Sequence, residues 1–185
     1  TGAAEAPFAT IDKAVLTART AGDVIHVLPG TYATTLGLYN DDNAKWGPNL
    51  CVKMVGAGAT RDEVVLKSRG THRTLRMAAN AWVENMTLEG EPTFKADRGG
   101  VVEMTGGVLT NCVVRNGTAT GNGGNLYMTA GVVADCVISN GTIKSTNTEW
   151  NGPKGVNVCL NGAARLLRCH VVGGTTTRKE DGTFY

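Results

Sequence analysis

The chain has 185 residues, enough for one domain, and its 42% hydrophobic and 18% charged residues are typical of a folded protein rather than a disordered one. The formal net charge is only +2, and lysines and arginines do not cluster, which argues against nucleic acid as a partner. No apolar run reaches the roughly 18 residues that a membrane helix needs, so no membrane span is expected.

The first predicted element is a short amphipathic helix. Apolar residues recur at helical spacing after Thr10, which is a suitable N-cap, and Gly22 follows as a stop signal. We therefore predict a capping helix within residues 10–20, ending near Ala18. The rest of the single domain, residues 23–185, is poor in aromatic residues and rich in Gly and Thr, which favours short strands and tight turns.

Beyond residue 23 a weak pattern repeats, in which two apolar residues flank one variable residue. The spacing averages about 27 residues, and a second apolar strand follows four of these units at a nearly constant offset. Such a period with variable loops predicts short strands that stack from one repeat to the next, as in a β-solenoid. The six units are Ile25/Val27, Val52/Met54, Leu75/Met77, Val102/Met104, Leu126/Met128 and Val158/Leu160.

The second strand of the repeat carries an inward ladder made of Met86, Cys112, Cys136 and Cys169. The five cysteines of the chain include no CxxC pair, so neither a complete disulfide framework nor a zinc knuckle is indicated. We interpret these thiols as core packing, because free cysteine commonly behaves as a small buried hydrophobic residue. A redox or metal role is the alternative.

The N-terminal part carries a family resemblance. The segment from Pro7 to Ala18, followed by GDVIHVLPGTY at 22–32, resembles the opening of pectin-lyase-like right-handed parallel β-helix proteins. Residues 107–114 resemble the repeats of bacterial secreted and surface β-helix proteins. The resemblance implies an all-β, right-handed parallel β-helix of about six coils, located outside the cell or on its surface. It does not fix the activity, because this scaffold carries lyases, hydrolases, epimerases, adhesins and phage tail spikes.

The C-terminal end of the predicted stack has no obvious cap. Residues 182–185 resemble the start of a further strand, and a bare last coil would leave an edge of unpaired backbone groups. We therefore expect a fragment of a longer β-helix, with further coils or a capping partner at this end. The alternative is that residues 175–185 fold back as a small cap.

Strand alternation predicts one outward column, formed by His26, Lys53, Arg76, Glu103, Tyr127 and Cys159. Neighbouring Lys53 and Arg76 would lie about 5 Å apart, which requires a compensating anion such as an acidic sugar or Glu103. If the chain is a lyase, the resemblance implies Lys53 as base and Arg76 as acid, with calcium on the uronate. The alternative is a solvated face on which Arg76 pairs with Glu103. The Cys159 thiol is expected to be exposed.

Insertions predict loops at one corner of the stack, at residues 37–50, 89–100, 116–125 and 141–156. With the outward column they would wall a groove, in which aromatic and basic side chains suit a sugar. In the alternative, Trp46 and Trp150 cover their own coils. Asp41 and Asp42 are candidate calcium ligands, but they lack the spaced acidic pattern of a calcium loop. The candidate ligand-binding residues are Lys45, Trp46, Phe94, Lys95, Arg98, Tyr127, Trp150 and Lys154.

The acidic and histidine motifs of known β-helix hydrolases, lyases and epimerases are not visible in this sequence. Our leading hypothesis is therefore a non-catalytic secreted or surface segment that presents stacked loops to a polysaccharide or another glycan surface, without a cofactor. One rival is a polysaccharide lyase, or a related carbohydrate-active enzyme, that acts on an anionic glycan. The other is a structural stalk or a tail-spike-like segment.

Overall fold

The computed structural model describes residues 2–18, 20, 22–34, 36, 52–69, 72–93, 96–145 and 154–177. In these ranges α1 (Ile11–Thr17) is the only helix. The Thr10 Oγ1 accepts a hydrogen bond of 3.2 Å from the backbone N–H of Lys13, and Ile11 and Val15 are buried. The predicted short N-terminal helix and its cap are confirmed.

The described strands form three sheets, and each pair of neighbouring strands in them is parallel. The first sheet contains β1 (Val24–Val27), β3 (Lys53–Gly56), β5 (Leu75–Met77), β6 (Trp82–Glu84), β9 (Val102–Thr110), β12 (Leu126–Ala134), β15 (Val158–Leu160) and β16 (Arg165–Leu167). The second contains β2 (Gly30–Thr34), β4 (Val64–Ser68), β7 (Thr87–Glu89), β10 (Val113–Arg115), β13 (Val137–Ser139) and β17 (His170–Val172). The third contains β8 (Ala96–Arg98), β11 (Thr118–Asn122), β14 (Thr142–Lys144) and β18 (Thr175–Thr177).

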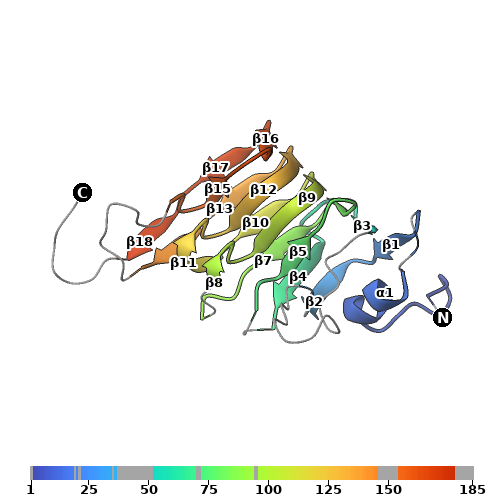
Figure 1. Cartoon of the computed structure of the whole chain (residues 1–185). Helices are drawn as coiled ribbons and strands as arrows, with labels where there is room; N and C mark the ends of the chain where they lie inside the picture. The colour runs from blue at the N-terminus through green and yellow to red at the C-terminus, as the bar shows by residue number, and fades with distance from the viewer. Residues whose placement is uncertain are drawn as a thin grey trace, which may run out of the picture.

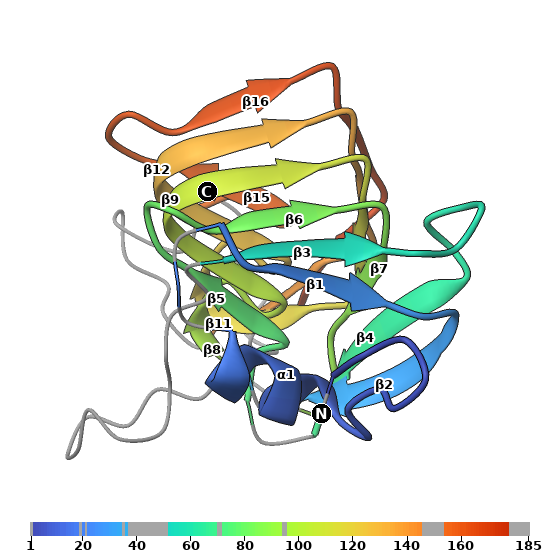
Figure 2. The ribbon, with the colours of Figure 1, turned by 90° about the vertical axis from the view of Figure 1, so that its right-hand side faces the viewer.

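The chain visits these sheets in a fixed rotation (Figure 1). From β9 it passes to β10 and β11 and then returns to the first sheet at β12, and the same order repeats through β18. We call one such pass a circuit. Figure 2 shows β1, β3, β6, β9, β12 and β16 as successive rows of one face. The prediction of an all-β chain built from parallel strands is confirmed.

The third sheet corrects the predicted loops. The strands β8, β11 and β14 lie within residues 89–100, 116–125 and 141–156, all of which were predicted as loops. These strands are short, and each buries few apolar side chains, such as Ala96, Ala119 and Ile143. Thr, Ala, Asn and charged residues fill their other positions, so they lack the apolar alternation that identifies a strand in a sequence.

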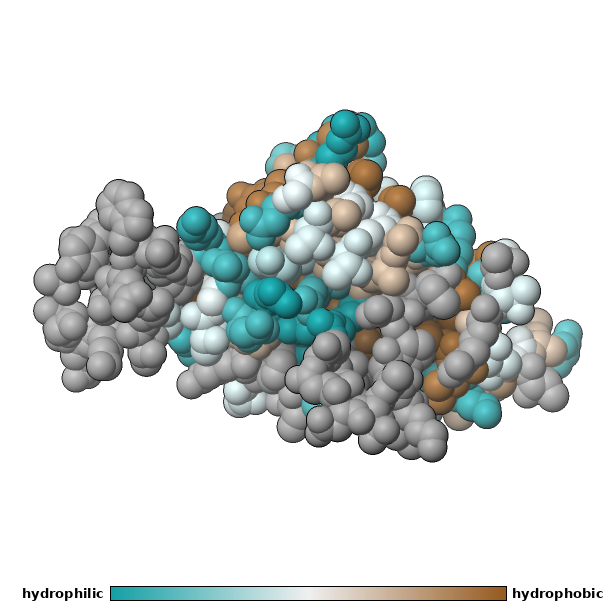
Figure 3. All heavy atoms as spheres, in the orientation of Figure 1, coloured by the Kyte–Doolittle hydropathy of each residue, from teal (hydrophilic) through white to brown (hydrophobic). Residues whose placement is uncertain are grey.

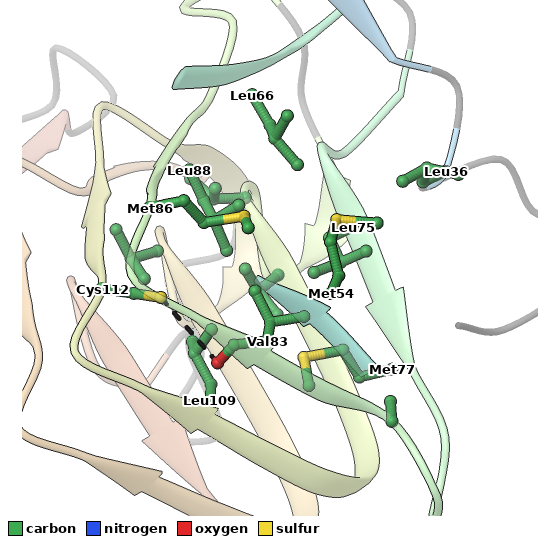
Figure 4. Close-up of a cluster of buried hydrophobic side chains, with 14 of the residues drawn as sticks. Leu36, Met54, Leu66, Leu75, Met77, Val83, Met86, Leu88, Leu109 and Cys112 are labelled. Atoms are coloured by element: carbon green, nitrogen blue, oxygen red, sulfur yellow. Dashed lines mark hydrogen bonds between the residues drawn. The ribbon is translucent and has the colours of Figure 1, made fainter. Parts of the chain in front are cut away.

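The core lies between the sheets and consists of aligned apolar side chains. Leu66, Leu88, Val114 and Ile138 are register partners across the second sheet and are fully buried. Figure 4 shows Leu88 and Leu109 in this interior, with the Cys112 Sγ 4.0 Å from the Val83 carbonyl oxygen. The predicted inward ladder is confirmed, since its members Met86, Cys112 and Cys136 are buried and Cys169 is partly buried against the core.

Two asparagines that the sequence analysis did not single out support the interior. Asn125 and Asn157 are buried, and their side chains join two successive circuits. The Asn125 Nδ2 donates to the Asn157 Oδ1 at 2.8 Å, and the Asn125 Oδ1 accepts from the backbone N–H of Gly117 at 2.7 Å. These bonds satisfy polar groups that would otherwise destabilise the interior.

The last described circuit leaves part of the core uncovered. Val171 of β17 is the register partner of Ile138, yet 44% of Val171 is exposed whereas Ile138 is fully buried. Val172 and Leu167 are exposed as well. Figure 3 shows apolar residues along this edge of the molecule, over β17.

Candidate functional site

Glu103 of β9 lies at the centre of a charged cluster on the outward side of the first sheet. Its neighbours Val102 and Met104 point into the core, which turns the Glu103 carboxylate outward. The carboxylate is nevertheless only 4% exposed, because arginine side chains cover it. The Arg73 Nη1 lies 2.5 Å from Oε2, the Arg76 Nη2 lies 2.6 Å from Oε2, and the Arg98 Nε lies 3.1 Å from Oε1. We call these four residues, with Asp97, the arginine cluster.

Arg73 holds the connection between β8 and β9 in place. Its Nε donates to the Gly99 carbonyl at 3.2 Å, and its Nη2 donates to the Arg98 carbonyl at 3.0 Å and to the Asp97 Oδ1 at 3.4 Å. Burial lowers the pKa of the Arg73 guanidinium, and attraction to Glu103 opposes that shift. Because all its nitrogens are engaged inside the protein, Arg73 has a structural role in the cluster.

Arg98 is the accessible member of the arginine cluster. Its side chain is 44% exposed, and its guanidinium carbon lies 4.9 Å from the centre of the Tyr127 ring. The Nε lies 3.1 Å from the Glu103 Oε1 and 3.7 Å from the Asp97 Oδ2, and neither Nη1 nor Nη2 donates to another residue in the described ranges. Burial tends to lower the pKa of Arg98, but attraction to Glu103 and Asp97 outweighs it and raises the pKa. The terminal edge of this guanidinium is therefore charged and open.

The arginine cluster presents one guanidinium edge to solvent. Glu103 and Arg73 are largely buried, where the dielectric response is weak, so electrostatic interactions at the cluster are strong. The open edge of Arg98 has the fork geometry that binds a carboxylate or another oxyanion through two hydrogen bonds.

The predicted outward column is correct for four of its members. Arg76 pairs in register with Glu103, Glu103 with Tyr127, and Tyr127 with Cys159. Lys53 was placed in this column wrongly, because its register partner is Trp82, and His26 was also misplaced, because its partner is Val55. The cause is that β5 and β6 both pair with β9, one with each half, so two outward columns run side by side.

Lys53 and Arg76 therefore do not form the predicted pair of adjacent cations. The Lys53 Nζ lies 3.1 Å from the Glu84 Oε2 and 5.1 Å from the centre of the Trp82 ring. Arg76 instead binds Glu103, as the alternative interpretation expected. The expectation of a solvated face is wrong at Glu103 and Tyr127, which are both buried.

The remaining candidates divide between the described and the undescribed parts of the chain. The arginine cluster brings Arg76 and Arg98 together with Tyr127. Lys154 is exposed and lies near Cys159, at the other end of the column. Burial raises the pKa of Cys159, and the positive charge of Lys154 opposes part of that shift. The predicted site residues Asp41, Asp42, Lys45, Trp46, Phe94, Lys95 and Trp150 lie outside the described residues.

The structure corrects the predicted exposure of Cys159, which is outward but only 8% exposed. Burial raises the pKa of its thiol, so less of the reactive thiolate is present near neutral pH. We expect iodoacetamide to label Cys159 in the native protein about tenfold or more slowly than in the urea-unfolded chain. Mass spectrometry of the Cys159 peptide measures both rates, and equal rates would contradict the buried position.

No group of three or more His, Cys, Asp or Glu side chains in the described ranges is arranged to hold a metal ion. None of the helical structure described here is long and apolar enough to cross a membrane. Comparison with known proteins found no matching family model, no matching curated protein and no matching solved structure.

Proposed function

We propose that this chain is a segment of a right-handed parallel β-helix of about six coils that binds an anionic glycan without cleaving it, outside the cell or at its surface. The fixed rotation of the chain through three parallel sheets, and the N-terminal helix beside β1, support this architecture. The resemblance of the N-terminal segment to pectin-lyase-like proteins supports the extracellular setting.

The observation that carries the binding proposal is the Arg98 guanidinium. Its position is set by Glu103 on one side and the Tyr127 ring on another, while Nη1 and Nη2 have no partner in the described chain. A prepositioned guanidinium loses little conformational freedom when it binds an anion. The positive charge of the open Arg98 guanidinium favours a sugar that carries a carboxylate or sulfate.

The geometry supports binding better than cleavage. A lyase needs a base and an acid on either side of one sugar ring. Lys53 and Arg76, the residues suggested for these roles, belong to different columns and are both engaged in ion pairs. The partly uncovered core at Val171 supports the further proposal that additional coils or a capping partner contact the last circuit.

The test is affinity electrophoresis in gels that contain sodium polygalacturonate or, as a neutral reference, dextran. We expect polygalacturonate to retard the native protein and Arg98→Ala to weaken its apparent affinity about tenfold or more, through loss of a charge-assisted fork. Arg98→Lys should give an intermediate affinity, since an ammonium group cannot form the same pair of bonds. Arg168→Ala is the matched control, because exposed Arg168 pairs with Asp135 at another corner.

Absorbance of unsaturated uronate ends, followed in the same protein–polysaccharide mixtures, separates binding from cleavage. Retardation without an absorbance increase is the expected result. An increase that depends on the protein would contradict the non-catalytic proposal. Absence of retardation, or equal weakening by Arg98→Ala and Arg168→Ala, would contradict binding at the arginine cluster and leave a structural stalk as the better interpretation.

A further inference from the structure

A second group of side chains lies on the outward face of the first sheet, in the column that contains Lys53. The register runs from Lys53 of β3 to Trp82 of β6, then to Val108 of β9 and Val132 of β12. We call these four residues, with Glu84 beside Trp82, the Trp82 strip. Adjacent strands are about 4.8 Å apart, so the strip is a continuous track across four strands.

Trp82 is the large aromatic side chain of this strip, and 37% of the residue is exposed. Tryptophan is usually well buried, so an indole left open on a regular sheet requires an explanation. The sheet itself is rigidly held, because β6 is paired on both sides, with β3 and with β9. The next positions along the track, Val108 and Val132, are also partly exposed.

Polar contacts fix the orientation of the indole. The Trp82 Nε1 donates to the Glu84 Oε2 at 3.0 Å, and the Lys53 Nζ lies 3.1 Å from the same oxygen. The Lys53 Nζ is also 5.1 Å from the ring centre, within the range of a cation–π interaction. Hydrogen bonds from Lys53 and Trp82 lower the pKa of Glu84, so this arrangement persists into mildly acidic solution.

The chemistry of the strip selects a class of ligand. Lys53 and Glu84 compensate each other, so the strip has no charge surplus and does not favour an anion. A neutral sugar ring presents apolar C–H groups on its face and hydroxyl groups at its rim. The indole can contact the former, while the ammonium and carboxylate groups can donate to and accept from the latter.

We propose that the Trp82 strip is a binding site for neutral hexopyranose units of a glycan. The site is separate from the arginine cluster: Trp82 pairs with the second half of β9, at Val108, whereas Arg76 pairs with the first half, at Glu103. It uses apolar contact and uncharged hydroxyls, whereas the Arg98 site uses an oxyanion. The proposal does not depend on the function proposed for the arginine cluster.

The test is isothermal titration calorimetry of the whole chain with cellohexaose and, separately, with mannohexaose. We expect at least one to bind, and Trp82→Ala to weaken that binding about tenfold or more, as removal of a central aromatic contact does elsewhere. Trp82→Phe should retain part of the affinity. Leu28→Ala is the matched control, since Leu28 is an exposed apolar residue in the connection between β1 and β2.

Each outcome of this experiment decides the proposal. Failure of both hexasaccharides to bind the native chain would overturn it, as would an unchanged affinity in Trp82→Ala when circular dichroism shows the variant to be folded. Equal weakening by Leu28→Ala would also overturn it. Arg98→Ala should bind the neutral sugar like the native chain, so a failure at the arginine cluster and a failure at the Trp82 strip give distinguishable results.

Discussion

Replacement of Glu103 by glutamine is expected to destabilise the protein by about 3 to 5 kcal/mol, the range found when one partner of a buried ion pair is removed. The substitution keeps the shape of the side chain and removes its charge. Arg73 and Arg76 are both largely buried and would lose this carboxylate, and Arg73 would retain only the mostly exposed Asp97 among the described acidic groups that it contacts. Urea denaturation followed by circular dichroism measures the change in the free energy of unfolding.

The control for this substitution is Asp97→Asn. The Asp97 carboxylate also meets Arg73, at 3.4 Å, but it is 74% exposed and water compensates for much of its charge. We expect a loss between about 0 and 1 kcal/mol, as is typical of exposed ion pairs. Equal effects of Glu103→Gln and Asp97→Asn would mean that Glu103 does not organise the cluster.

The general architecture could be predicted because it depends on local patterns. The apolar pairs Leu126/Met128 and Val158/Leu160 recur with their inward faces aligned, and both lie on paired strands of the first sheet. The helix signal after Thr10 is also local, since one hydroxyl and an apolar face determine it. Such features need no knowledge of which strands become neighbours.

The register between strands could not be predicted with the same success. Alternation shows which side chains share a face, but it does not identify the partner strand. Both Leu75/Met77 and Ala81/Val83 fit the apolar pattern, and Met54 aligns with Val83 rather than with Met77. The three-dimensional path of the chain decides which of these two pairs aligns with Met54. As a result, Lys53 lies in the second outward column and not in the predicted one.

Only part of the candidate site could be predicted, because its composition also depends on which segments become neighbours. The alignment of Arg76, Glu103 and Tyr127 followed from the repeat. Arg73 was missed because it precedes β5 and approaches the Glu103 carboxylate from a segment outside the repeated pairs. Trp82 was missed because the apolar pair that flanks it, Ala81/Val83, was passed over in favour of Leu75/Met77 as the unit that follows Val52/Met54.

A second large effect is expected from Leu109→Ala, compared with the identical substitution at Leu166. Both residues are register partners of Val133 and occupy the same inward column. Leu109 is fully buried between neighbouring circuits, whereas Leu166 lies in the last described circuit and is partly exposed. We expect a loss of about 2 to 5 kcal/mol for Leu109→Ala, since a cavity forms in a closed core. The loss for Leu166→Ala should be about 1 kcal/mol, because less apolar area leaves water there on folding.

Urea denaturation and amide hydrogen exchange should be measured together for this pair. Stacked circuits contact mainly their neighbours, so the last circuit can open before the rest unfolds. Exchange at Leu166 should then be faster than at Leu109 in the native protein. Equal losses of stability, with equally slow exchange at both positions, would contradict an open last circuit. The matched pair therefore measures how far the packing of the interior extends toward the edge formed by β16 and β17, where the apolar residues Leu167 and Val171 are exposed.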